Sequence, residues 1–104
     1  MQRDKVLAYL GLGTRGGHTA SGEFSVEQSL KQRRARLVIV AEEASENTKK
    51  KFRDRCAYRQ VPLYFFGTGV QLGRACGKDF RISVAVEDEG LAEAIIRQFA
   101  QEQV

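Results

Sequence analysis

The sequence predicts an α/β fold, a three-layer α/β/α sandwich around a small mixed sheet of about four strands. Short apolar runs of strand length alternate along the chain with longer helical patterns, and this alternation favours a sheet with helices on both sides. The run 37–41 is apolar at every position, as expected for a strand covered on both faces. Residues 88–101 carry an apolar stripe with a 3.6-residue period, which is typical of a helix packed on a sheet.

The first half of the chain is expected to contain three helices. Four glycines between positions 11 and 17 should break the first helix, because glycine is a poor helix former. Ser45 can cap the third helix, since its hydroxyl can accept from a free backbone N–H. The expected elements are a helix over 3–10, a short extended piece over 18–21, a helix over 23–33, a strand over 37–41 and a helix over 45–58.

In the second half, strands and helices continue to alternate. Pro62 stops the third helix and leads into a strand, because proline lacks the N–H that a helix needs. The expected elements are a strand over 63–66, a helix over 69–76, a turn over 77–79, a strand over 82–86 and a helix over 88–101. We expect three loops that leave strand ends to gather at one edge of the sheet.

The length of 104 residues predicts one domain over 1–104. A net charge of +4 favours an anionic partner only mildly. No apolar run approaches the roughly 20 residues that span a bilayer, and the N-terminal residues lack a signal-peptide pattern. We therefore expect a cytoplasmic protein with no membrane partner.

Catalytic and metal-binding patterns are scarce. Cys56 and Cys76 form no CxxC motif and the chain has one histidine, His18, so we expect buried structural thiols rather than a zinc site. His18 has no Cys or Ser partner in any nucleophile motif. The acidic groups 42–43 and 87–89 flank helix starts, where acids favour the helix dipole. We expect no catalytic residue, metal, cofactor or small-molecule substrate.

One motif suggests an enzyme instead. Residues 11–16 match GxGxxG, and if residues 6–10 were a strand this would be a dinucleotide-binding start with Glu42 as a candidate ribose ligand. The residues after Gly16 lack the apolar stripe of the required helix, and Glu42 comes later than the usual spacing. The preferred interpretation is a connection that follows the first helix.

The junction between the strand 37–41 and the following helix favours binding of a nucleic acid. Free N–H groups and the positive end of the helix dipole collect where the helix begins. Such an end can hold phosphate, and Lys49, Lys50 and Lys51 follow closely. The non-functional alternative for this basic run is a solvated helix face.

Several motifs occur together in a fixed order. They are Gly-Leu-x-x-Arg-Gly-Gly from position 11, Ser21-Gly22-Glu23, the segment 37–51, Val61-Pro62, Phe66-Gly67-Thr68 and the segment 72–78. In this order they resemble the ribosomal protein L7Ae/L30e family, and within it the short bacterial YlxQ-type branch. The resemblance covers about residues 4–99. It implies an α/β/α sandwich, no enzymatic activity, and binding of kink-turn or similarly bent RNA, associated with the ribosome or translation. Ribosomal RNA and ribosome-associated proteins are the implied partners.

The resemblance also implies where RNA binds. Three segments would meet it: the turn into the second helix, the loop after the central strand, and the loop before the last strand. Gly22 would let the RNA backbone approach closely. The implied RNA-binding residues are Ser21, Gly22, Glu23, Phe24, Ser25, Gln28, Glu42, Glu43, Ser45, Lys78 and Arg81.

The chain departs from the family pattern at one place. Strong kink-turn binders carry Asn-Glu-x-x-Lys at the entry to the second helix, where this chain has Phe24, Ser25 and Gln28. Phe24 either stacks on a base or packs into the fold. The alternative function is a protein–protein adaptor that keeps the fold without kink-turn specificity. A positive edge formed by the three segments would favour RNA, and an acidic or flat apolar edge would favour the adaptor.

Overall fold

A computed structural model describes residues 3–101 of the chain. Four strands and five helices alternate along it. In chain order they are α1 (Arg3–Arg15), β1 (Thr19–Ser21), α2 (Glu23–Lys31), β2 (Leu37–Val40), α3 (Glu46–Arg59), β3 (Leu63–Phe65), α4 (Gly69–Ala75), β4 (Ser83–Val86) and α5 (Glu89–Gln101).

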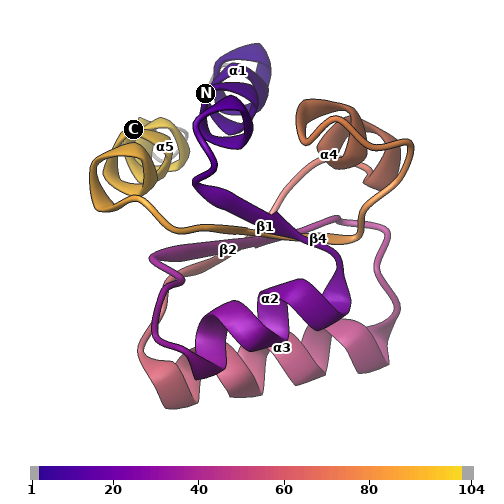
Figure 1. The fold of residues 1–104 in the computed structure, drawn as a ribbon. Coiled ribbons are helices and arrows are strands. Elements are labelled where there is room, and N and C mark those ends of the chain that lie inside the picture. The colour runs from indigo at the N-terminus through magenta and orange to yellow at the C-terminus, as the bar shows by residue number, and fades with distance from the viewer. Residues whose placement is uncertain (1–2, 102–104) are drawn as a thin grey trace.

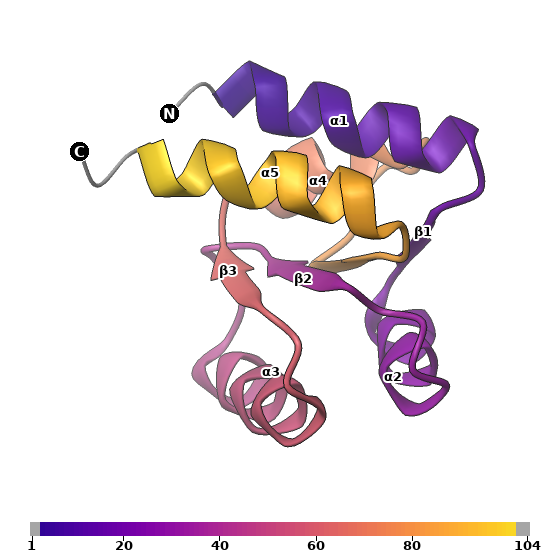
Figure 2. The same ribbon diagram turned by 90° about the vertical axis from the view of Figure 1, so that its left-hand side faces the viewer.

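The strands form one mixed sheet in the order β1-β4-β2-β3. Strand β4 runs antiparallel to both β1 and β2, and Val38 of β2 lies opposite Ala85 of β4. Strands β2 and β3 are parallel, with Ile39 opposite Tyr64. Helices α1, α4 and α5 cover one face of the sheet, and α2 and α3 cover the other (Figures 1 and 2). The predicted α/β/α sandwich with about four strands is confirmed.

Strand β2 lies between two apolar cores. Leu37 and Ile39 point into the core beneath α1, α4 and α5, and Val38 and Val40 point into the core above α2 and α3. All four side chains are fully buried. The unbroken apolar run is therefore explained by the two helical layers, because each face of the strand meets one of them.

The first helix is longer than the sequence predicts. Helix α1 continues to Arg15 and contains Gly11 and Gly13, so the prediction that these glycines break the helix was wrong. A Cβ at Gly13 would overlap the side chain of Leu91 and lie 3.1 Å from Thr19 Cγ2. The missing side chain lets α5 and β1 approach α1 closely, and this packing offsets the low helix propensity of glycine.

The position of these glycines also tests whether the GxGxxG motif of residues 11–16 forms a dinucleotide-binding site. Residues 6–10 are helical, and the GxGxxG motif lies at the end of α1 rather than between a strand and a helix. The backbone turns at Gly16 and Gly17, and Gly17 has φ +77°. The motif therefore lacks the strand–turn–helix context of a dinucleotide site, and the preferred interpretation as a connection was wrong for residues 11–15, which belong to α1.

The remaining boundaries differ from the prediction by one or two residues. Helix α2 ends at Lys31 rather than at 33, because Gln32 is its C-cap and Arg33 adopts a left-handed φ of +60°. Helix α5 begins after Asp88, whose carboxylate accepts a hydrogen bond from the Leu91 N–H at 2.8 Å. Within residues 3–101, every helix is too short or too polar to cross a bilayer.

Both cysteines are buried free thiols, as predicted. Burial raises the pKa of Cys56 to about 11 and also raises the pKa of Cys76.

The acidic group 87–89 has structural partners. Glu87 accepts a hydrogen bond from Ser29 at 2.6 Å and lies 3.4 Å from the Arg34 guanidinium.

Candidate nucleic-acid interface

The three segments that were predicted to bind RNA meet at one edge of the sheet, and a chain of hydrogen bonds joins them. The Arg81 N–H donates to the Gly69 carbonyl at 2.9 Å, and the Gly69 N–H donates to the Glu43 carboxylate. The Arg81 Nε donates to Ser21 Oγ at 3.3 Å. We call this surface, formed by 21–28, 42–45, 67–69 and 77–81, the loop edge.

Gly22 marks the start of α2 at the loop edge. It is the N-cap residue, with φ +95° and ψ 153°, and no side chain caps the helix. Its N–H donates to the Ser83 carbonyl at 2.9 Å, which anchors the turn to β4. The first-turn amides of α2 thus have no acceptor from a cap side chain, and this is the arrangement that a phosphate can use.

Glu42 and Glu43 tie the loop after β2 to the loop before α4. The Glu42 carboxylate accepts from the Gly67 N–H at 3.0 Å, and the Glu42 N–H donates back to the Gly67 carbonyl at 2.9 Å. The same carboxylate lies 3.7 Å from the Arg3 guanidinium. Both acids therefore have partners within the protein itself.

Ser45 and Glu23 have structural roles at the loop edge. Ser45 is the N-cap of α3, and its Oγ accepts from the Thr48 N–H at 3.1 Å. Glu23 forms an ion pair with Lys51 of α3. These contacts explain both residues without a ligand.

The lysines that follow Ser45 are also paired within the protein. Lys50 lies 3.0 Å from Asp54, and Lys51 pairs with Glu23 and lies 3.7 Å from Glu27. Ser45 already caps α3, and these lysines have acidic partners. The structure therefore favours a solvated helix face for this basic run over a phosphate site at the α3 N-terminus.

Two cations of the loop edge have no acidic partner in residues 3–101. Neither Lys78 nor Arg81 has a carboxylate within 4.0 Å in this part of the chain. Lys78 is exposed and follows Gly77, which turns the chain with φ +72°. The Arg81 guanidinium also donates to the Phe80 carbonyl at 2.8 Å, so it is held over the start of α2.

Apolar side chains stand out from the loop edge. The exposed fractions are 74% for Phe24 and 48% for Phe80, and 42% for Val70, which directly follows the loop edge on α4. The packing interpretation of Phe24 was wrong, because a side chain this exposed contributes little to the core. Ser25 next to it is exposed, and Gln28 is half-buried one turn further on.

Phe80 lies in the implied RNA-binding loop 77–81, but the predicted site residues include neither it nor the glycines beneath it. A Cβ at Gly69 would overlap the Phe80 ring, and a Cβ at Gly73 would lie 2.6 Å from the Phe80 backbone nitrogen. These glycines lie four residues apart on one face of α4, and that spacing was the available signal. Thr68 and Gln71 form a capping box that fixes the start of the same helix.

Comparison with known proteins assigns the family. The model of the ribosomal protein L7Ae/L30e/S12e/Gadd45 family matches residues 4–96. RNA-binding protein YlxQ of Bacillus subtilis (strain 168) is 42% identical over 87 residues, which are 84% of this chain and 87% of that protein. Large ribosomal subunit protein eL30 of Methanothermobacter thermautotrophicus is 32% identical over 76 residues, covering 71% of this chain and 78% of that protein.

Two solved structures share the fold. The structure of a protein with unknown function from Bacillus halodurans C has a TM-score of 0.85 and 34% identity, and covers 89% of this chain and 94% of that chain. The Giardia lamblia 15.5kD RNA binding protein has a TM-score of 0.74 over 92% of this chain and 82% of its own, and at 20% identity it supports the fold alone. Since the family model spans most of the chain, the protein belongs to the ribosomal protein L7Ae/L30e/S12e/Gadd45 family.

Proposed function

We propose that the protein binds structured RNA at the loop edge, as a non-enzymatic cytoplasmic protein associated with the ribosome or translation. The observation that carries the proposal is the position of Arg81. Its guanidinium has no carboxylate within 4.0 Å in residues 3–101 and lies beside the uncapped N-terminus of α2. A cation and free amides side by side suit a phosphate.

The exposed side chains suggest which RNA the loop edge accepts. Phe24 offers a flat aromatic face to solvent, and unstacked bases of bent RNA stack on such faces. Relatives of this chain are named as RNA-binding and large-ribosomal-subunit proteins, which supports RNA as the ligand and ribosomal RNA as its source. The loop edge carries five acids beside Lys78 and Arg81, so the preference for RNA over the adaptor alternative rests on these two cations and on the RNA-binding relatives rather than on net charge.

Filter binding with two RNAs of equal length tests the proposal, one an internal-loop duplex with a kink-turn and the other a straight duplex. We expect tighter binding of the bent RNA. We also expect a log–log slope of affinity against salt near −2 to −4, because about three to five phosphate contacts each contribute roughly 0.7 to 0.9. Absence of RNA binding at low salt, or an affinity that ignores salt, would contradict the proposed function.

A further inference from the structure

A cleft of about 790 Å³ lies at the opposite end of the sheet from the loop edge. Arg36, which precedes β2, lines this cleft, whereas Glu42 of the loop edge follows the same strand. Arg33 lines it just beyond the C-terminal end of α2, whereas Gly22 caps the other end. We call this surface the far cleft, and its volume falls in the range of ligand sites.

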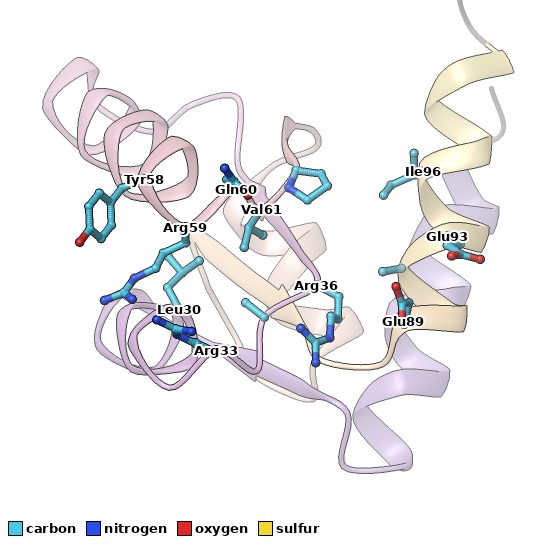
Figure 3. A pocket seen from close by; sticks show the side chains of 13 residues that line it. Leu30, Arg33, Arg36, Tyr58, Arg59, Gln60, Val61, Glu89, Glu93 and Ile96 are labelled. Carbon is cyan, nitrogen blue, oxygen red and sulfur yellow. The ribbon is translucent and has the colours of Figure 1, made fainter.

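Three arginines reach the far cleft (Figure 3): Arg33 and Arg36 come from the segment between α2 and β2, and Arg59 is the last residue of α3. In residues 3–101, no carboxylate lies within 4.0 Å of any of their guanidinium groups. The neighbouring Arg34, in contrast, is paired with Glu87 at 3.4 Å. The three cleft arginines therefore keep their hydrogen-bond donors for an anion.

The acids of the far cleft belong to one wall. Glu89 and Glu93 lie on α5, across the cleft from Arg33 and Arg59, and the Glu93 side chain points away from these arginines (Figure 3). The wall formed by the C-terminal ends of α2 and α3 thus carries Arg33 and Arg59, whereas Arg36 lies between this wall and Glu89 (Figure 3).

An aromatic ring stands beside this cationic wall. Tyr58 is 80% exposed, and the Arg59 guanidinium carbon lies 5.1 Å from the centroid of its ring. Exposed aromatic rings and arginine planes are the surfaces on which the bases of single strands stack. In the aliphatic lining, Leu30, Ala35 and Ala92 are each at most 3% exposed, and accessible apolar area is limited to Val61, Pro62 and Ile96. The unpaired arginines therefore make an anion the better match than an apolar protein surface.

We propose that the far cleft binds a single-stranded segment of RNA. Phosphates lie on Arg33, Arg36 and Arg59, and a base stacks on Tyr58. The choice of RNA among polyanions rests on the proposed function, while the site is separate from the loop edge. Helix α2 has nine residues, so it spaces the two surfaces by about 14 Å, and they contact different segments of RNA.

Titration of the isotope-labelled protein with a 10-nucleotide single-stranded RNA, followed by NMR, tests this site. We expect shifts of the arginine Nε signals of Arg33, Arg36 and Arg59 and of the Tyr58 ring. The double variant Arg36→Gln/Arg59→Gln should bind about tenfold more weakly. Its salt slope should fall by about 1.4, because each phosphate contact of a single strand contributes roughly 0.7. Tyr58→Ala should weaken binding about fivefold or more.

A matched control variant separates the far cleft from a general effect of net charge. Lys50→Gln/Arg97→Gln removes the same charge at exposed positions that do not line the cleft, and it should keep the affinity within about twofold. An equal loss in this control would reduce the effect to net charge and overturn the proposal. Spectral dispersion of each variant checks that it is folded.

The loop-edge variant Lys78→Ala/Arg81→Ala should still bind the single strand. Loss of binding in this variant would place the strand at the loop edge and overturn the proposal. So would cleft shifts with a decaglutamate peptide but none with RNA, since the occupant would then be an acidic peptide. If structured RNA fails to bind while the single strand still shifts the NMR signals of the cleft residues, the proposed function is refuted and the proposal for the far cleft is supported.

Discussion

Arg81 and Gly22 are in van der Waals contact at the loop edge. A Cβ on Gly22 would lie 3.6 Å from both Cδ and Nε of Arg81. The guanidinium therefore rests against the first turn of α2 and reaches Ser21 Oγ at 3.3 Å. This contact joins the segment before β4 to the start of α2, and so it unites two of the three predicted RNA-binding segments.

Replacing Gly22 tests this contact and the backbone beneath it. With φ +95° and ψ 153°, Gly22→Val should lose about 1 to 3 kcal/mol of stability, because side-chain-bearing residues rarely adopt this conformation. The branched side chain should also displace Arg81, so RNA affinity of the folded protein should fall. Thermal melting and filter binding on one sample measure both effects.

Gly17→Ala is the matched control for this glycine. Gly17 has φ +77°, and within residues 3–101 no atom lies within 4 Å of an added Cβ, so the variant should lose roughly 1 kcal/mol from strain alone and keep its RNA affinity. If Gly22→Val melts lower but its folded fraction binds RNA normally, the contact of this turn with the RNA backbone is refuted.

Removing the free cations of the loop edge should weaken RNA binding. Lys78→Ala/Arg81→Ala should lower the salt slope by roughly 1.4 to 1.8, since each phosphate contact contributes about 0.7 to 0.9. Stability should change by no more than about 1 kcal/mol, because the lost side-chain hydrogen bonds of Arg81 are partly exposed. Lys5→Ala/Arg97→Ala removes equal charge at exposed positions of α1 and α5, and a comparable effect there would argue against the loop edge.

Phe24→Ala should separate base stacking from folding. The side chain is 74% exposed, so unfolding free energy should stay within about 0.5 kcal/mol. Affinity for bent RNA should fall about fivefold or more, because base–aromatic stacking contributes roughly 1 to 3 kcal/mol. Leu12→Ala, at 56% exposed on α1, is the control. Unchanged affinity of the Phe24 variant would remove stacking from the proposed binding mode.

Ser45→Ala should show that this residue supports the fold rather than the RNA. Loss of the cap to the Thr48 N–H should cost about 1 kcal/mol, measured by urea unfolding. RNA affinity of the folded protein should be unchanged. A clear affinity loss with normal stability would instead restore Ser45 to the RNA-binding set.

Stability should fall between about pH 9 and pH 11 because of Cys56. Burial raises the pKa of its thiol to about 11 in the native state, against about 9 when it is solvated, so the unfolded chain releases the proton first. The loss should reach roughly 2 kcal/mol once the pH passes the native pKa. Urea unfolding across this range measures it, and Cys56→Ala should show a shallower decline. Parallel declines in both proteins would exclude the thiol as the cause.

The sequence by itself determined the layers and most of the elements. The apolar run of β2 and the stripe of α5 depend only on which residue types recur along a short segment, so local periodicity was enough to predict them. The Ser45 cap and the turn at Gly77 were readable for the same reason. The family motifs also indicated the three segments that meet at the loop edge.

Only the tertiary structure decided which residues that are distant in sequence contact one another. Gly13 stays helical because Leu91, far along the chain, fills the space of its missing side chain. Glu43 accepts a hydrogen bond from the Gly69 N–H, which follows it by 26 residues. Phe24 is exposed because the fold turns its position outward. Arg36 and Arg59 share a cleft because α3 ends beside the start of β2. Such contacts join residues that are remote in sequence, and local pattern carries no information about these pairings.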